Sequence, residues 1–312
     1  MTQEQTTHIS VIDPLGPAFE RVKVILFKPF DLGKWFVIGF CAWLAGLGEN
    51  GGGGGGGRRF RWERHADAHQ LAEQAKDFVL ENLFWIIPAT IFVILLITGL
   101  WLLVTWLSSR GRFMFLHCVA QNKAEVKVPW SRFRRHANSL FLFRIIVGLI
   151  ALAAFSLPCL LAVFFIFAII SGPPYVWPIS GLGVIGLAIF VLVIAFWLVK
   201  RFTTDFVMPI MFLGPTSCTA AWRQFLTILA ANKARFALYA LFRIVIAIAI
   251  GVIVIAVVLV TCCCALCIFT IPYIGTVAFL PVLVFVRAYS LCYFCQFGPQ
   301  FDVFIPEAEV TG

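Results

Sequence analysis

The chain has 312 residues, of which 61% are hydrophobic and 12% are charged, and its formal net charge is +9. Soluble domains carry about 25% charged residues, so this composition excludes a soluble globular protein. The basic residues lie in short loops beside apolar runs, which indicates membrane orientation rather than nucleic-acid binding. Several runs exceed about 18 residues without alternating polarity, so we predict an all-α polytopic membrane protein and not a β-barrel.

The first predicted elements lie at a membrane surface. Residues 18–30 mix apolar and basic side chains and predict an amphipathic helix in the headgroup region. Asp31 is expected to cap the helix that follows. The first predicted span, 35–48, is about 21 Å long as a helix. It therefore crosses only if the bilayer thins or if residues before Lys34 join it.

A glycine-rich segment separates the first two predicted spans. It starts with seven glycines, residues 51–57, and no predicted strand precedes them, which favours a flexible linker over a phosphate-binding loop. Residues 58–81 carry charges of both signs and predict a helix outside the bilayer. We therefore expect segment 49–81 to form a linker and a helix on the extracytoplasmic side.

The connectors between the apolar runs predict the topology. Residues 108–138 contain seven Lys or Arg residues against one acidic residue, which marks this connector as cytoplasmic. Residues 200–235 are also basic, and connectors of little net charge alternate with these two. The pattern predicts a protein of the plasma (inner) membrane with both termini in the cytoplasm. The six predicted spans are 35–48, 82–107, 139–171, 179–199, 236–261 and 276–297.

An internal repeat groups these spans into three helical hairpins. Each unit reads as a proline, an amphipathic segment, a basic residue, an outward span, a turn, an inward span and a second basic residue. The sequence Leu-Phe-Arg-Ile occurs at 142–145 and again at 241–244. The units, 15–122, 123–214 and 215–300, lie within one membrane domain, 1–312. They run the same way through the membrane, so we predict parallel repeats about an axis normal to it.

The matched basic residues of the repeat form the candidate binding set for anionic headgroups. Two interpretations are open: they are snorkelling anchors that hold the topology, or they form a basic pocket. A charge at depth in a membrane is usually paired or faces the protein interior. Pairing with Asp31, Asp205 or Asp302 would make the set structural. The six residues are Lys34, Arg110, Arg144, Arg201, Arg243 and Arg287.

Two groups of cysteines contain a C-x-x-C spacing, which can hold zinc when two such elements meet. Here a predicted span separates the groups, so we expect the thiols to pack between helices. A disulfide in the outer group and acylation of the inner group are alternatives. The outer group is Cys262, Cys263, Cys264 and Cys267, and the inner group is Cys292 and Cys295.

Other chemistry-bearing patterns are weak. His65, His69 and Glu73 would share a helix face that suits a metal ion, but their polar neighbours favour a solvated face. No nucleophile lies beside an evident base, so no catalytic residue is predicted. We predict no metal site and no cofactor.

Two short stretches carry a family resemblance. Leu15-Gly-Pro-Ala-Phe-Glu-Arg-Val and Phe27-Lys-Pro-Phe-Asp-Leu-Gly-Lys-Trp-Phe, together with the three-hairpin layout, resemble uncharacterised bacterial and archaeal six-span membrane families. The layout is also similar to the membrane region that precedes some glycerophosphodiester phosphodiesterases. The sequence contains no phosphodiesterase catalytic domain, so the resemblance implies a membrane fold and no activity.

These observations lead to one main hypothesis about function. We expect a non-enzymatic integral membrane protein that binds anionic lipid or serves as a membrane subunit or scaffold. A channel or transporter for a small solute and a lipid-acting membrane enzyme are the alternatives. The expected partners are membrane lipids, further copies of the chain or other membrane subunits, and not nucleic acid.

Overall fold

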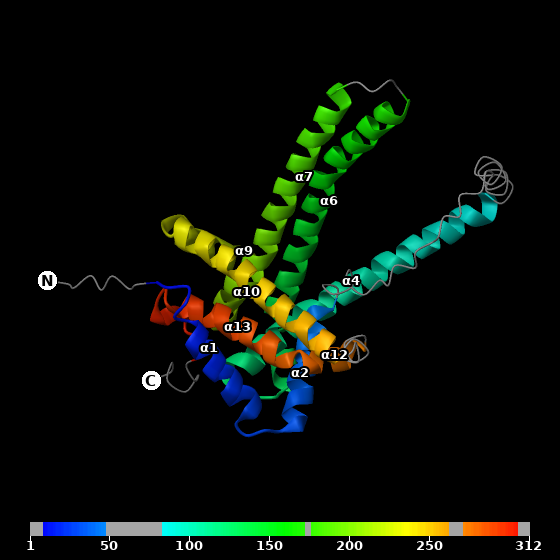
Figure 1. The fold of residues 1–312 in the computed structure, drawn as a ribbon. Helices are drawn as coiled ribbons and strands as arrows, with labels where there is room; N and C mark the ends of the chain where they lie inside the picture. The colour runs from blue at the N-terminus through cyan, green and yellow to red at the C-terminus, as the bar shows by residue number, and fades with distance from the viewer. Residues whose placement is uncertain (1–8, 48–82, 172–175, 262–270, 305–312) are drawn as a thin grey trace.

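The computed structural model describes residues 9–47, 83–171, 176–261 and 271–304, and these residues form helices and no strand (Figure 1). The predicted all-α class is therefore confirmed. Segment 49–81 and most of the connector between the last two predicted spans, with the outer cysteine group, lie outside the described residues. The helices are α1 (Leu15–Val22), η1 (Lys23–Phe27), α2 (Leu32–Gly46), α4 (Leu83–Gln121), α5 (Lys127–Arg132), α6 (Arg134–Ser171), α7 (Val176–Phe202), η3 (Thr203–Val207), α8 (Met208–Leu213), α9 (Cys218–Ala231), α10 (Lys233–Val260), α12 (Pro272–Ala278), α13 (Leu280–Cys295) and η4 (Pro299–Phe301).

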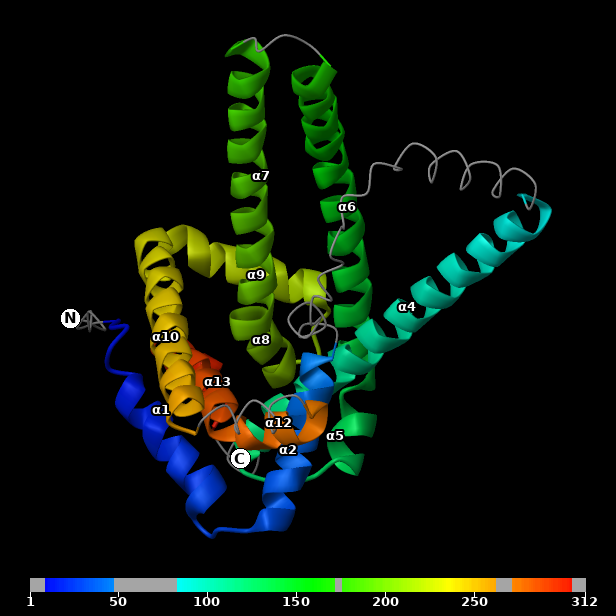
Figure 2. The same ribbon diagram turned by 45° about the vertical axis from the view of Figure 1, so that its right-hand side comes forward.

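The described helices converge on a buried base, from which α4, α6 and α7 project (Figures 1 and 2). Aromatic rings fill this base. Phe206, Phe225 and Phe236 are fully buried, the rings of Phe206 and Phe225 are stacked with centroids 5.3 Å apart, and Phe236 meets Phe225 edge to face at 5.3 Å. Aromatic side chains bury large apolar areas and prefer such offset and edge-on geometries, so the base is the best-packed part of the fold.

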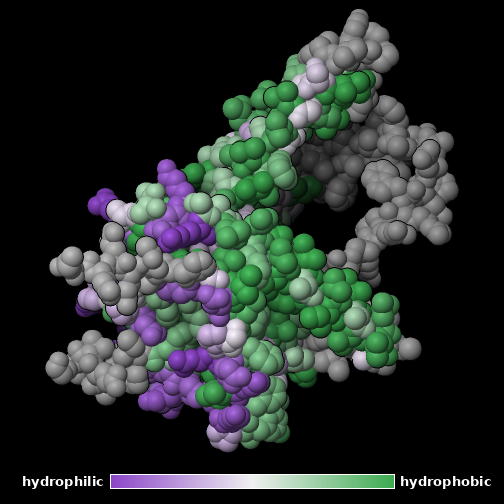
Figure 3. All heavy atoms as spheres, turned by 60° about the vertical axis from the view of Figure 1, so that its left-hand side comes forward, coloured by the Kyte–Doolittle hydropathy of each residue, from purple (hydrophilic) through white to green (hydrophobic). Residues whose placement is uncertain are grey.

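Within the described residues, four helices are long and apolar enough to cross a membrane, which indicates a membrane protein. Protein covers almost none of their most apolar windows, so these surfaces suit hydrocarbon rather than water. Figure 3 shows hydrophilic residues gathered at one end of the molecule and hydrophobic residues covering the helices beyond it. The four candidate spans are Phe84–Gln121, Arg134–Ile169, Ile179–Leu213 and Lys233–Val260.

The other two predicted spans correspond to short helices. Helix α2 has 15 residues and α13 has 16, fewer than the roughly 20 that cross a bilayer as a straight helix. Helix α2 lies beside the base end of α4: Lys34 Nζ is 2.7 Å from Asn122 Oδ1, and Ser108 Oγ donates to the Ala45 carbonyl at 2.8 Å. The described part of α2 therefore does not run beside the exposed outer half of α4.

Helices α6 and α7 form an antiparallel pair. Their rings meet at Phe155 and Phe196, with centroids 5.8 Å apart, and an added Cβ at Gly181 would lie 2.5 Å from Phe165 Cε1. Helix α4 diverges from this pair, and α10 runs beside α13 and leaves α7 in another direction (Figures 1 and 2). We call the opening between α7 and α10 the α7–α10 fork.

The observed start of α2 and the observed end of α4 can be compared with the predicted ones. Asp31 caps α2 as expected, because its side chain accepts from the Gly33 N–H at 2.8 Å. Helix α4 was expected to end near residue 107 but continues to Gln121. Its extension carries Phe113, Met114 and Leu116, whose burial in the base stabilises four more helical turns than hydropathy alone predicts.

The amphipathic helix predicted at 18–30 is present as α1 and the π-helical turn η1. Ala18 and Ile25 face the base and are fully buried, whereas Phe19 is exposed. Lys23 Nζ lies 2.8 Å from Glu20 Oε1 on the outer surface, and this hydrogen bond holds the pKa of the Glu20 carboxyl below its usual value. The apolar face of this helix therefore packs on protein, and its place in the headgroup region stays a prediction.

Candidate functional site

A π-helical turn at the inner end of α7 organises the polar centre of the base. Such turns add a residue to the helical repeat and are frequent at functional sites. Here η3 places Asp205, which is 3% exposed, beneath α10. Arg201 Nε lies 2.8 Å from Asp205 Oδ2, and the Tyr239 hydroxyl donates to the same oxygen at 2.9 Å. One carboxylate therefore links α7 to α10.

Two further arginines reach the same turn from other helices. Arg287 of α13 donates from Nη1 to the Thr204 carbonyl at 2.5 Å, and Arg112 of α4 donates to Thr204 Oγ1 at 3.1 Å. Both arginines are buried. Side chains from α4, α10 and α13 thus meet at η3, which makes this turn the junction of the fold.

The cluster around η3 carries an excess of positive charge. Asp205 is its single acidic residue within the described part of the chain, and Coulomb attraction reaches from it to Arg243 and Arg287 as well as to Arg201. The Nε of Arg243 and one terminal nitrogen of Arg287 have no hydrogen-bond partner among the described residues. Buried charges and donors are costly unless they are paired, so the cluster is chemically suited to accept an anion.

An open cavity of about 500 Å³ adjoins this cluster at the α7–α10 fork. Arg201 and Arg243 line its base end, and apolar side chains form the rest of the described lining. Arg243 is only 5% exposed and still reaches the cavity. A groove with two guanidinium groups at one end and an apolar wall suits an anionic head with a hydrocarbon tail. The apolar lining is Trp197, Ile244, Ala247, Ile248, Ile250 and Val286.

Most of the chain matches one known protein family. A model of a family of unknown function, DUF7544, matches residues 9–295, which include the base, the fork and all four candidate spans. The chain belongs to the DUF7544 family. No curated protein and no solved structure matches it. The expectation of an uncharacterised family is confirmed, while the likeness to the membrane region of glycerophosphodiester phosphodiesterases stays a prediction.

In this DUF7544 chain the six candidate basic residues do not gather into one pocket. Arg201, Arg243 and Arg287 meet around η3, as described above. Arg144 Nη1 instead donates to Ser109 Oγ at 3.1 Å and to Ser108 Oγ at 3.3 Å, tying α6 to α4. Their role in binding headgroups stays a prediction.

The remaining two candidates are held by other contacts. The guanidinium of Arg110 lies 4.3 Å from the ring centroid of Trp106 and 4.7 Å from that of Trp130. Lys34 donates to Asn122 Oδ1 at 2.7 Å, just past the base end of α4. Neither of these two residues lines the cavity at the fork, whose described basic residues are Arg201 and Arg243.

The acidic partners considered from sequence have separate roles. Asp205 pairs with Arg201, whereas Asp31 caps α2. Asp302 accepts from the Phe304 N–H at 2.9 Å and from the Cys295 thiol at 3.5 Å. Of the three acids, Asp205 is the one whose described ion pair involves a candidate arginine. The pairing that was expected to mark a structural role is therefore present at Arg201, and no ion pair is described for Arg243.

Sequence reasoning missed three members of the DUF7544 cluster, Arg112, Thr204 and Tyr239. Tyr239 precedes Arg243 by four residues, a spacing that places both on one helix face. That spacing was a usable signal. Arg112 lies beyond residue 107, where hydropathy ends the second predicted span. Thr204 contributes a hydroxyl and a backbone carbonyl, which no sequence pattern marks.

Proposed function

We propose that the chain is a non-enzymatic integral membrane protein that binds one anionic phospholipid at the α7–α10 fork. The phosphate would lie against Arg201 and Arg243, and an acyl chain would follow the apolar wall of the groove. The observation that carries this proposal is Arg243, a buried guanidinium whose Nε has no described partner and which lines the open cavity. A guanidinium presents several N–H donors in a fork that matches phosphate geometry.

The charge of the cluster supports an anion rather than a neutral ligand. Arg112, Arg201, Arg243 and Arg287 surround η3, and Asp205 offsets one of these four charges. In a site of low dielectric an uncompensated cation is costly. A bound phosphate would supply the missing negative charge and accept hydrogen bonds from donors that lack partners.

The proposed membrane arrangement keeps six spans in three parallel-repeated hairpins, with both termini on the cytoplasmic side of the plasma membrane. Three antiparallel contacts support it: α2 with α4, α6 with α7, and α10 with α13. In the third, the rings of Tyr239 and Tyr293 are stacked with centroids 4.6 Å apart. Ser10 and Gln296 exchange hydrogen bonds of 2.8 and 3.0 Å, so the two ends of the described chain lie at the same end of the fold.

A labelling experiment tests this arrangement. Single cysteines at Thr7, Gly54 and Val128 in a cysteine-free chain would be probed with an impermeant maleimide. We expect Thr7→Cys and Val128→Cys to react only from the cytoplasm and Gly54→Cys only from outside. Reaction of Thr7→Cys and Gly54→Cys from the same side would show that α2 does not cross, and reaction of Val128→Cys from outside would overturn the orientation.

A lipid-retention assay tests the binding site. The full chain would be placed in nanodiscs that contain phosphatidylglycerol and phosphatidylcholine, and bound lipid would be measured by native mass spectrometry. We expect Arg243→Gln to weaken phosphatidylglycerol binding about tenfold or more, because a hydrogen bond to a charged group contributes roughly 1.5–3 kcal/mol. Arg201→Gln should act in the same direction.

Arg144→Gln is the matched control. It removes the same charge at the same end of the molecule, but its described partners are Ser108 and Ser109 of α4. It should retain phosphatidylglycerol at the wild-type level, and gel filtration would show that each variant is folded. Wild-type retention by folded Arg243→Gln, or equal losses from Arg144→Gln and Arg243→Gln, would contradict the proposed site.

A further inference from the structure

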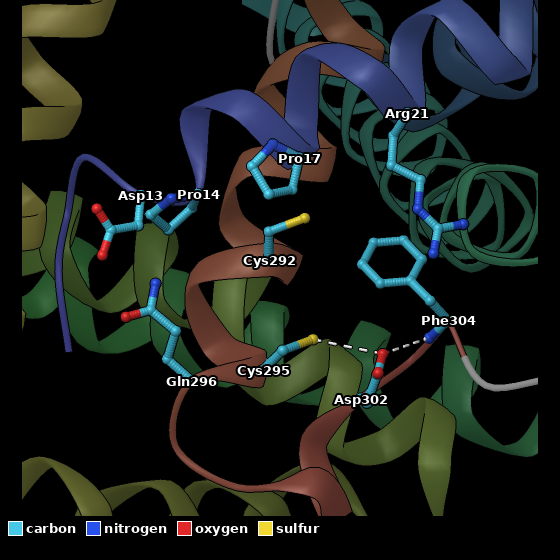
Figure 4. Close-up of a pocket in the computed structure, with 9 residues that line it drawn as sticks. All are labelled: Asp13, Pro14, Pro17, Arg21, Cys292, Cys295, Gln296, Asp302 and Phe304. Carbon is cyan, nitrogen blue, oxygen red and sulfur yellow. Dashed lines mark hydrogen bonds between the residues drawn. The ribbon is translucent and has the colours of Figure 1, made fainter. Parts of the chain in front are cut away.

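A second cavity, separate from the fork, lies between α1 and the C-terminal end of α13 (Figure 4). Its volume is about 410 Å³, within the range of roughly 300–1,000 Å³ that holds small ligands. Two free cysteines, Cys292 and Cys295, line it and are half-buried. Figure 4 shows both sulfur atoms on the side of α13 that faces the cavity.

The spacing of these thiols permits a bond between them. Two residues three apart on an α-helix have Cα atoms about 5 Å apart, inside the range of roughly 4.4–6.8 Å that disulfides accept. Cys295 is also the last residue of α13, and the chain after it continues as turns, with the Gly298 N–H donating to the Cys295 carbonyl at 3.2 Å. The end of the helix can therefore adjust to bring the sulfur atoms together.

The charged groups of the cavity indicate what kind of molecule reaches the thiols. Two carboxylates, Asp13 and Asp302, line it and can bind an amine on a ligand, and Arg21 of α1 is its cation. The Arg21 guanidinium stacks over the ring of Phe304, with its carbon 4.0 Å from the ring centroid. This stacking holds a cation opposite the thiols, as Figure 4 shows. A guanidinium in this position favours a ligand that carries a carboxylate. Among the described residues, no group of three or more His, Cys, Asp or Glu side chains could hold a metal ion.

We propose that Cys292 and Cys295 form a dithiol site that reacts with a small, carboxylate-bearing disulfide and closes to an intrahelical disulfide. One protein thiolate attacks the small disulfide, whose S–S bond breaks and releases one small thiolate. The second protein thiolate then attacks the mixed disulfide and expels the other small thiolate. The two protons lost by the cysteines are taken up by the two leaving thiolates, so two protein thiols are oxidised and one disulfide is reduced.

Closure would change contacts at the end of the chain. The Cys295 thiol donates to Asp302 Oδ1 at 3.5 Å and lies 3.8 Å from the Phe301 carbonyl oxygen. A disulfide removes the thiol proton and draws this sulfur toward Cys292, which ends the contact with Asp302. The segment 299–304 then loses a direct side-chain link to α13, and its amides should exchange with deuterium faster.

The test uses the full chain in detergent with oxidised glutathione as the anionic probe and cystamine as the cationic one. The expected product is a peptide that contains both Cys292 and Cys295 and has lost two hydrogens, restored by dithiothreitol. Cys295→Ser should stop closure and leave one glutathione on Cys292. Arg21→Gln should slow the reaction severalfold with oxidised glutathione and leave the rate with cystamine unchanged.

The same protein supplies the controls. Cys41 and Cys118 are fully buried and should stay reduced in the folded chain and react after denaturation. The proposal would be overturned if Cys292 and Cys295 stayed reduced in the folded chain under conditions in which the denatured chain reacts. Accumulation of a glutathione on each cysteine without closure would overturn it too, and so would equal effects of Arg21→Gln on both probes.

Discussion

The hydroxyl of Tyr239 donates a 2.9 Å hydrogen bond to Oδ2 of Asp205, and both residues are buried where α10 crosses the turn η3. Arg201 bonds to the same carboxylate oxygen. Beyond this point α7 and α10 diverge (Figure 2). The contact therefore holds together two helices whose outer parts share little packing, and it fixes the carboxylate among the arginines of the junction.

Tyr239→Phe should destabilise the fold by about 1.5–3 kcal/mol, because it leaves a buried charged acceptor short of one donor. Thermal unfolding in detergent would measure the loss. Tyr273→Phe is the control, since that hydroxyl donates at 2.9 Å to the Phe36 carbonyl in an exposed position and should contribute less than about 1 kcal/mol. Equal losses of stability in the two variants would show that the hydrogen bond to Asp205 contributes no more than the exposed one to Phe36.

Asp205→Asn should be more damaging than Tyr239→Phe. It removes the single described carboxylate of the cluster and leaves Arg201 without its ion pair. Removing one partner of a buried pair costs roughly 3–5 kcal/mol. The free energies of unfolding of Asp205→Asn, Arg201→Gln and the double variant would complete a double-mutant cycle. The double variant should lose less stability than the two single variants lose together. Strict additivity would contradict coupling between these side chains.

Gly111→Ala should separate α2 from α4. An added Cβ at residue 111 would lie 2.6 Å from the Ala45 nitrogen and 2.6 Å from the Leu44 carbonyl carbon. These are backbone atoms, which cannot rotate away, so we expect a loss of about 1–3 kcal/mol. Gly99→Ala on the same helix has no described atom within 4 Å and should be neutral or slightly stabilising. Similar melting temperatures for the two variants would refute the close contact.

Arg110→Lys tests the aromatic anchor between α4 and α5. The planar guanidinium stacks on Trp106 and Trp130, and an ammonium group keeps the charge but not this geometry. We expect a loss of about 0.5–1 kcal/mol and a change in tryptophan fluorescence. Arg132→Lys is the comparison, because Arg132 lies 5.6 Å from the Phe133 ring centroid on the exposed face. It should change stability by less than half as much.

Hydropathy predicted the parts of the fold that depend on composition alone. The runs that became α6, α7 and α10 were placed within about five residues at each end, because long uncharged segments have few alternatives in a bilayer. The cap at Asp31 was predictable because capping is a local interaction. The extension of α4 to Gln121 was not, since its stability comes from burial against segments distant in the sequence.

The candidate site was predictable only in part. The repeat placed Arg201, Arg243 and Arg287 at matching positions, and the fold brings these three together around η3. The same rule placed Arg144 with them, but Arg144 contacts α4 at another junction. Register within a repeat gives the depth of a residue along a helix, and the direction it faces depends on how the helices cross, which the pattern does not contain.

The divergence of α4 from the α6–α7 pair has a consequence for the bilayer itself. A wedge between membrane helices cannot stay empty, because hydrocarbon flows into any space that protein leaves open. Lipid tails in this wedge would lie against the exposed apolar side chains of α4 and α6, such as Leu95 and Leu149. Longer or more saturated tails would press the helices to a different tilt, so the composition of the surrounding lipid would set the shape of the outer half of the protein.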